Sequence, residues 1–288
     1  MIKEQGKRNI AYLFILIGII NYIIAEYMKT SGVWFYETFF TPIVWSGYIL
    51  LLDGINHLRR NRSLIINETK NFLWMLLISI GLWYIFEFYN LFIDNWHYVN
   101  LPENKTIRFI GYFWSFATIW PAIFETYIFL TGIKLFSKLR VKKQMLSTKT
   151  FYILVIIGFV FEILPFVFPN RYWAPIIWTG FILLLDPINY KLGRPSLFRE
   201  WKDGSMSALF RLFTSGFICG LLWEFWNYWA GAKWVYTVPY FGDAKLFEMP
   251  VIGFLGFLPF AVEVFVLYVF IGWLFERILR IKGIGFRL

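Results

Sequence analysis

The chain has 288 residues, of which 59% are hydrophobic, 23% are aromatic and 16% are charged, with a formal net charge of +10. An average soluble domain is only roughly 45–50% apolar, so this composition excludes a soluble globular protein and indicates an all-α polytopic membrane protein. The single cysteine, Cys219, excludes an internal disulfide, and two histidines offer no zinc or haem ligand set, so we expect no metal and no cofactor.

Long apolar segments follow one another along the chain, each near the ~20 residues that a helix needs to cross the hydrocarbon core of a bilayer. The first is preceded by a basic N-terminus like that of a signal peptide, but Glu26 follows it in place of a small-residue cleavage site, so we expect a retained span. We predict eight transmembrane helices, at about residues 9–28, 37–57, 71–93, 107–136, 151–169, 172–190, 207–230 and 250–276.

Most of the 28 Lys and Arg residues lie at the two termini and in alternate connections between these spans. The positive-inside rule then places the N- and C-termini in the cytoplasm, and we expect an integral protein of a bacterial cytoplasmic (inner) membrane. The basic excess is a topology signal with some attraction to anionic headgroups, so the expected partners are membrane lipids and not nucleic acid.

The chain contains the same pattern twice. Residues 42–64 align with residues 175–197 without a gap, sharing the run Ile-Leu-Leu-Leu-Asp followed by Ile-Asn. The similarity continues downstream through a Glu-Phe-aromatic-Asn motif, a Trp-x-Tyr motif and a proline followed four residues later by glutamate.

Four spans per copy is an even number, so both copies have the same orientation in the membrane. We therefore predict two parallel four-helix repeats, related by a pseudo-twofold axis along the membrane normal. The first repeat covers residues 1–136 and the second covers residues 151–288, and residues 137–150 form a basic cytoplasmic linker.

Glu125 and Glu263 each follow a proline, Pro121 or Pro259, by one helical turn. The proline should kink its helix and release the carbonyl four residues earlier. Acidic residues inside spans are costly and usually face the bundle interior. We expect both glutamates to be protonated, because desolvation disfavours the charged carboxylate, and to be candidate catalytic proton donors. The alternative is that each is neutral and forms a hydrogen bond across the repeat interface.

Glu87 and Asn90, repeated as Glu224 and Asn227, lie one turn apart within aromatic surroundings. The two glutamates are candidate partner acids or bases in catalysis. An interhelical hydrogen-bond lock is the alternative. The candidate substrate-binding residues are Asn90, Asn227, Trp83, Trp223, Trp226 and Tyr89.

Asp53 and Asn56, repeated as Asp186 and Asn189, share one helix face near the expected cytoplasmic end. We interpret them as helix-end anchors, with a Mg²⁺ site as the alternative because oxygen ligands suit that ion. The Trp-x-Tyr segments at residues 96–98 and 234–236 are interpreted as anchors at the outer membrane interface, or otherwise as a lid over the site.

The stretch from Trp234 through Gly253 and Gly256 to Pro259 and Glu263 resembles the integral-membrane lycopene cyclase domain family. That family is built from duplicated helical units with a Trp/Tyr segment, a glycine-containing helix and a proline followed by acids. The resemblance covers about 30 to 40 residues of each half. It implies an acid on a proline-kinked helix, here Glu125 and Glu263, and an isomerase acting on a carotenoid or another isoprenoid lipid.

The leading hypothesis is an intramembrane enzyme that protonates a polyisoprenoid or another lipid at buried glutamates. Such chemistry needs an acid, exclusion of water and aromatic faces near the carbocation. The first alternative is a proton- or cation-coupled transporter with its site between the two repeats. A Mg²⁺-dependent lipid transferase and a non-catalytic scaffold are the remaining alternatives.

Overall fold

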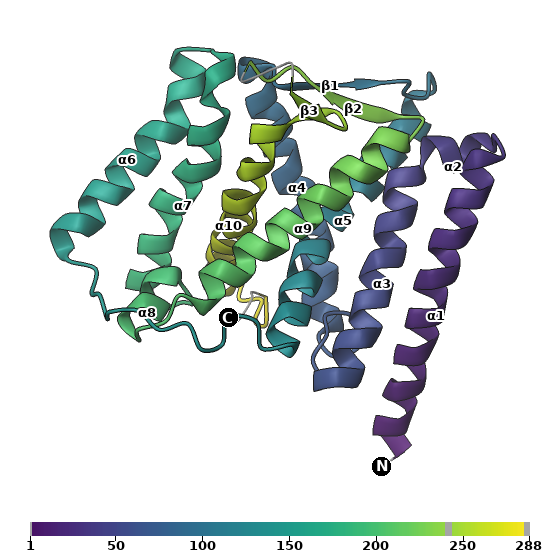
Figure 1. The fold of residues 1–288 in the computed structure, drawn as a ribbon. Coiled ribbons are helices and arrows are strands. Elements are labelled where there is room, and N and C mark those ends of the chain that lie inside the picture. Colours follow the sequence, from purple (N-terminus) through teal and green to yellow (C-terminus); the bar gives the residue numbers. More distant parts are fainter. Residues whose placement is uncertain (1, 240–243, 285–288) are drawn as a thin grey trace.

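The computed structural model describes residues 2–239 and 244–284, and helices dominate it (Figure 1). In the first half, α3 packs against α1 and α5, and α4 packs against α5. In the second half, α7 packs against α6 and α10, and α9 packs against α10, so the two halves have the same order of neighbours. The first-half helices are α1 (Ile2–Thr30), the short α2 (Trp34–Thr38), α3 (Phe40–Arg60), α4 (Thr69–Ile93) and α5 (Lys105–Gly132). The second-half helices are α6 (Thr148–Val167), α7 (Ala174–Lys191), the short α8 (Leu197–Lys202), α9 (Ser207–Trp229) and α10 (Phe257–Ile278), with 3₁₀ turns η1 (Arg171–Trp173) and η2 (Val251–Gly256).

The expected all-α class is confirmed, and each of the eight predicted segments coincides with a long helix. Within the described residues, six helical stretches are long and apolar enough to cross a membrane: α1, α4, α5, α6, α9, and η2 together with α10. Helices α3 and α7 are outside this set. They are the helices that carry Asp53 and Asp186, and each lies between two neighbours that cover much of its surface.

Close helix contacts depend on glycine at matched places in the two halves. A Cβ atom on Gly18 of α1 would lie 2.6 Å from the carbonyl oxygen of Gly47 in α3. A Cβ atom on Gly158 of α6 would lie 2.8 Å from the carbonyl oxygen of Gly180 in α7. Gly47 and Gly180 belong to the repeated segment, so the repeated pattern marks where α3 and α7 approach their first neighbours.

One end of the helix bundle, the strand end, is crossed by β1 (Trp96–Val99) and β2 (Lys233–Tyr236) (Figure 1). These strands are antiparallel, with Trp96 opposite Tyr236 and Tyr98 opposite Trp234. The Trp-x-Tyr motifs of the two halves therefore pair with each other. A second short pair, β3 (Lys245–Leu246) and β4 (Met249–Pro250), lies nearby.

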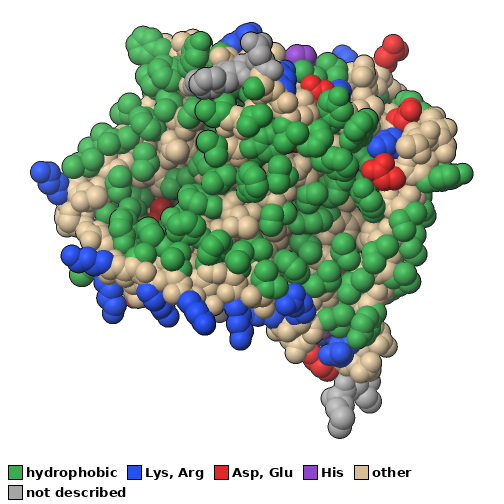
Figure 2. All heavy atoms as spheres, in the orientation of Figure 1, with side chains coloured by type: hydrophobic (Ala, Val, Ile, Leu, Met, Phe, Trp, Pro, Cys, Tyr) green, Lys and Arg blue, Asp and Glu red, His purple; other side chains and the backbone are tan. Residues whose placement is uncertain are grey.

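The opposite end, the basic end, contains α8, the segment between α5 and α6, and the start of α1 (Figure 1). Lys and Arg side chains gather along this edge below a broad surface of hydrophobic side chains (Figure 2). Exposed basic residues of these segments include Lys134, Lys138, Lys142, Lys143 and Lys202.

Candidate functional site

A cavity of about 520 Å³ lies at the strand end and is lined by residues of both halves. Pro42 and Trp45 of α3 line it together with their repeat counterparts Pro175 and Trp178 of α7. The Trp-x-Tyr motifs of β1 and β2 contribute Trp96, Tyr98, Trp234 and Tyr236. The cavity volume is within the roughly 300–1,000 Å³ that is typical of ligand pockets.

Aromatic rings in mutual contact form much of the cavity wall. Trp45 lies 5.2 Å from Trp223, and Phe260 lies 5.5 Å from Trp178, measured between ring centroids. Phe260 also lies 6.0 Å from Trp83. Contacting rings hold one another in place, and their faces favour apolar or cationic groups of a ligand.

The two predicted asparagines hold the strands over the cavity. Asn90 accepts hydrogen bonds from the backbone N–H groups of Asn95 (2.8 Å) and Trp96 (3.3 Å) and donates to the Trp96 carbonyl (2.7 Å). Asn227 accepts from the Trp234 N–H (2.9 Å) and donates to the Trp234 carbonyl (2.8 Å). Asn90 and Asn227 are not among the residues that line the cavity, so the structure gives them a different place from the one predicted.

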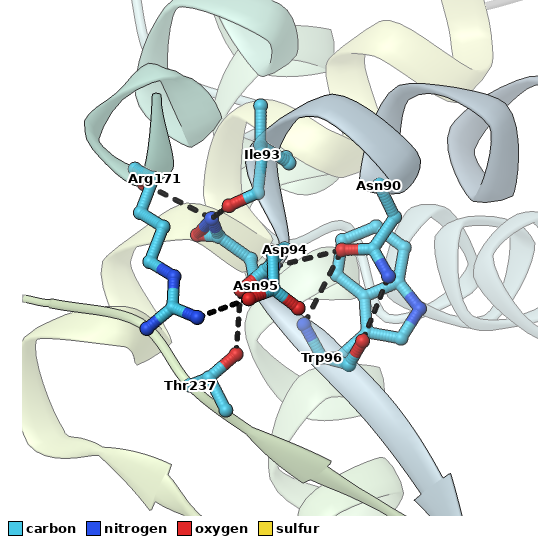
Figure 3. A network of polar contacts seen from close by, with 7 residues as sticks. All are labelled: Asn90, Ile93, Asp94, Asn95, Trp96, Arg171 and Thr237. Carbon is cyan, nitrogen blue, oxygen red and sulfur yellow. Dashed lines mark hydrogen bonds and ion pairs between the residues drawn. The ribbon is translucent and has the colours of Figure 1, made fainter. Parts of the chain in front are cut away.

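A further network of polar contacts joins the end of α4 and the start of β1 to residues of the second half (Figure 3). The Asn95 amide donates to the carbonyls of Ile93 (2.8 Å) and Arg171 (2.9 Å), so it joins the end of α4 to η1. Asp94 forms an ion pair with Arg171, and its carbonyl accepts from the Thr237 hydroxyl (2.6 Å). The two strands, which line the cavity at the strand end, are thereby fixed in place and form its cover. The anchor and lid interpretations of the Trp-x-Tyr motifs both stay predictions.

Glu87 and Glu224 lie behind the cavity wall, each bound to a tyrosine that lines it. One carboxyl oxygen of Glu87 accepts from the Trp83 indole (3.0 Å), the Trp96 indole (3.1 Å) and the Tyr98 hydroxyl (2.6 Å). Three donors on one oxygen suit an ionised carboxylate.

Glu224 has fewer donors. Its Oε1 accepts from the Tyr236 hydroxyl (2.9 Å), and Tyr236 in turn accepts from the Trp234 indole (3.0 Å). Its Oε2 is buried and has no hydrogen-bond partner in the described parts of the chain. The matched carboxyls thus differ: Glu87 accepts three hydrogen bonds on one oxygen, whereas Glu224 accepts from Tyr236 and has its other oxygen buried without a hydrogen-bond partner among the described residues.

Tyr98 and Tyr236 are neutral phenols in this site. Burial raises the pKa of each hydroxyl well above its ordinary value, and the neighbouring carboxyl of Glu87 or Glu224 raises it further. Each tyrosine therefore donates its hydrogen bond to the glutamate while its ring lines the cavity.

Glu125 lies away from the cavity in a buried cluster at the basic end. It accepts from the Leu64 N–H (2.9 Å) and from the Asn56 amide (2.6 Å). Asp53 accepts from the N–H groups of Ile65 and Ile66. These residues hold the loop between α3 and α4, which agrees with the helix-end anchor interpretation.

The second half uses Asp186 in the same way. Its carboxylate accepts from the N–H groups of Leu197 (2.9 Å) and Phe198 (3.1 Å), where α8 begins. Within the described residues no group of three His, Cys, Asp or Glu side chains is suited to a metal ion. The Asp53 carboxyl accepts from backbone amides and lies beside the Glu125 carboxyl, whereas the Asp186 carboxyl accepts from the amides of Leu197 and Phe198.

Replacing Asp186 by alanine is expected to lower thermal stability markedly. Both amides would lose their acceptor, and a buried donor that is left without a partner costs about 1–3 kcal/mol. Thermal unfolding of purified protein, followed by tryptophan fluorescence, measures the effect. Asp203→Ala, a change at an exposed position in the same connection, is the control; equal unfolding midpoints for the two variants would contradict the anchoring role.

Glu263 does not occupy the place that corresponds to Glu125. Asn56 donates to the carbonyl of Glu125 (3.0 Å), whereas its counterpart Asn189 donates to the carbonyl of Val266 (3.0 Å), about one turn further along α10. Aligning the two halves on Pro121 and Pro259 made Glu263 the counterpart of Glu125. The hydrogen bonds of the two asparagines show that Val266 instead occupies the place of Glu125 in the helix packing. Neither Glu125 nor Glu263 is a cavity-lining residue.

Of the predicted aromatic residues, Trp83 and Trp223 line the cavity, whereas Trp226 and Tyr89 do not. Trp226 packs behind the wall, 4.8 Å from Trp45. Tyr89 donates a hydrogen bond to Glu162 (2.7 Å), an acid of α6 that the sequence reasoning missed. Glu162 could have been found in the sequence as a single acidic residue within an otherwise apolar segment.

Comparisons with known protein families, characterised proteins and solved structures find no match to this chain. The protein is therefore classified by its own fold and site, as a helical protein with membrane-spanning character and an aromatic cavity between two similar halves.

Proposed function

We propose that the chain is an eight-span membrane protein of two parallel repeats, with the basic end in the cytoplasm and the strand end at the outer interface. Helices α3 and α7 have 21 and 18 residues, within the roughly 17–25 that a span needs. The gathering of Lys and Arg at the basic end supports this orientation (Figure 2).

The cavity, in this proposal, binds an unsaturated isoprenoid- or carotenoid-like lipid. Aromatic rings of both halves surround it, and β1 and β2 cover it at the strand end. Charged side chains are few in its wall, with Arg108 and Lys233 near the interface where a polar headgroup would lie. A flat, apolar chain suits such walls better than a hydrated solute does.

The observation that carries the proposed chemistry is the pair of matched Tyr–Glu contacts on one cavity. In this scheme the Tyr236 hydroxyl turns from Glu224 towards the cavity and gives its proton to an alkene carbon of the lipid, while the protonated Glu224 carboxyl gives its proton to the Tyr236 oxygen in its place. The resulting carbocation would be stabilised by the aromatic faces and would then lose a different proton through Tyr98 to Glu87. One proton enters the lipid and one leaves it, so the net reaction is an isomerisation.

Two carboxyls in different environments divide the acid and base roles in this scheme. The proposal assigns the roles to Glu224 and Glu87, and not to Glu125 and Glu263, because only the former contact tyrosines that line the cavity.

Replacing Gly256 by phenylalanine is expected to remove the bound lipid while the fold is retained. A Cβ atom at this cavity-lining position meets no atom within 4 Å, and its backbone conformation (φ −66°, ψ −25°) accepts any L residue. The measurement is mass spectrometry of lipid extracted from purified protein. Gly81→Phe is the control, because Gly81 is exposed on α4 and also meets nothing within 4 Å.

Wild type and Gly81→Phe should retain the same specific lipid, and Gly256→Phe should lose at least about nine-tenths of it. Bulk phospholipid alone in all three proteins would overturn the proposal, and solute uptake by the protein in liposomes would then favour the transporter alternative.

A further inference from the structure

Two buried carboxyl groups lie outside both the cavity wall and the loop anchors. Glu162 of α6 is 6% exposed and Glu263 of α10 is fully buried. Tyr89 of α4 donates to Glu162, with its hydroxyl 2.7 Å from Oε2 and 3.1 Å from the backbone carbonyl. Three helices thus bring two acids and a phenol into one region of the interior.

Three of the four carboxyl oxygens have no hydrogen-bond partner among the described residues. They are Oε1 of Glu162 and both oxygens of Glu263. Glu263 is close enough to Glu162 for the two carboxyls to interact electrostatically. Burying ionised carboxyls without a counter-charge is costly, and intramembrane acids usually pair with another group.

Space for the Glu162 carboxyl is provided by Gly180 of α7, where a Cβ atom would lie only 2.2 Å from Oε1. The counterpart in the first half is Gly47, whose Cβ would lie 2.5 Å from the amide oxygen of Asn21. The same glycine pocket therefore holds a neutral amide in one half and an acid in the other. The charge is peculiar to the second half, so general helix packing does not require it.

We propose that Glu162 and Glu263 together bind one monovalent cation, Na⁺ or a proton, with Tyr89 holding the first carboxyl in place. Either cation neutralises a negative charge between two buried carboxyls, and oxygen ligands suit Na⁺ as a hard ion. The ionisable groups that act here are Tyr89 from α4, Glu162 from α6 and Glu263 from α10. Asp186 of α7 is engaged by backbone amides. The proposal is independent of the lipid chemistry in the cavity.

The test is thermal unfolding of purified protein in lipid nanodiscs, with NaCl exchanged for choline chloride at constant ionic strength. A Na⁺ site predicts a saturable rise of the unfolding midpoint with Na⁺, because a ligand that binds only the folded state stabilises it. The rise should be lost in Glu263→Gln and Glu162→Gln and kept in Glu103→Gln, the same change at an exposed acid.

A second arm repeats the measurement in choline chloride alone from about pH 5 to pH 9. A proton site predicts that wild-type stability falls as pH rises, because deprotonation leaves buried charge uncompensated, and that Glu263→Gln removes most of this dependence. Calorimetric titration of wild type with NaCl, against choline chloride, decides the Na⁺ case if the variants do not fold. Equal responses to Na⁺ and choline, together with the same pH response in wild type and Glu263→Gln, would overturn the proposal.

Discussion

Replacing Gly216 by leucine is expected to prevent folding or to destabilise the protein by more than about 3 kcal/mol, beyond the usual 1–3 kcal/mol of overpacking. A Cβ atom at this position of α9 would lie 2.0 Å from the backbone carbonyl oxygen of Phe257 and 2.8 Å from the Cβ atom of Ala261. Because the first obstacle is the backbone of α10, the two helices would have to separate. Their contact carries Trp223 and Phe260, so the cavity wall would open as well.

Size-exclusion chromatography and thermal unfolding of the purified variant measure this effect. Gly81→Leu places the same side chain on the exposed surface of α4 and should behave like wild type. A Gly216→Leu protein with wild-type stability would show that α9 and α10 do not pack as described.

Replacing Glu224 by glutamine is expected to abolish conversion of the bound lipid, with a loss of about 10²–10⁴-fold that is typical of a general acid. Glutamine keeps an oxygen that accepts the Tyr236 hydrogen bond, so the cover over the cavity should remain in place. Tyr236→Phe removes the proton path by a second route. Mass spectrometry of extracted lipid should show that both variants retain lipid with a composition different from that of wild type.

Glu103→Gln, at an exposed position, is the control for this change and should leave the lipid composition unaltered. Wild-type lipid composition in Glu224→Gln and Tyr236→Phe would contradict the acid–base assignment. If the lipid composition of these two variants were that of wild type but Gly256→Phe still lost its lipid, the cavity would bind lipid without acid–base catalysis by Glu224.

Several structural features could be predicted from the sequence because they depend on local patterns. Apolar runs of sufficient length located the eight long helices, and the repeated Asp-x-x-Asn segments identified the buried anchors. Trp45 and Trp178 also lie in the repeated segment beside Pro42 and Pro175, so their place in the site could have been inferred from the duplication.

Features that depend on packing between distant segments were not accessible in this way. The pairing of β1 with β2 joins residues more than a hundred positions apart, and neither strand is long enough to show a strand pattern. The place of Glu263 depends on how far α10 is shifted against α7, which Asn189 and Val266 determine. The matching prolines suggested that Glu263 is equivalent to Glu125, but because of this shift the two glutamates occupy different places.

The role of Glu87 was ambiguous for a similar reason. An acid and an asparagine one turn apart indicate a polar site, but only the folded chain shows that Asn90 holds the strand and that Glu87 holds its tyrosine. In this Glu-Phe-aromatic-Asn motif, the asparagine therefore holds the strand that covers the cavity, and the glutamate binds a tyrosine that lines it.

The central claim, that a lipid occupies the aromatic cavity between the two halves, is tested most directly by electron cryomicroscopy of the wild-type protein in lipid nanodiscs. The proposal predicts elongated density between Trp45 and Trp178, beneath β1 and β2, that is missing from a Gly256→Phe map. Solvent alone between these tryptophans in the wild-type map would contradict it.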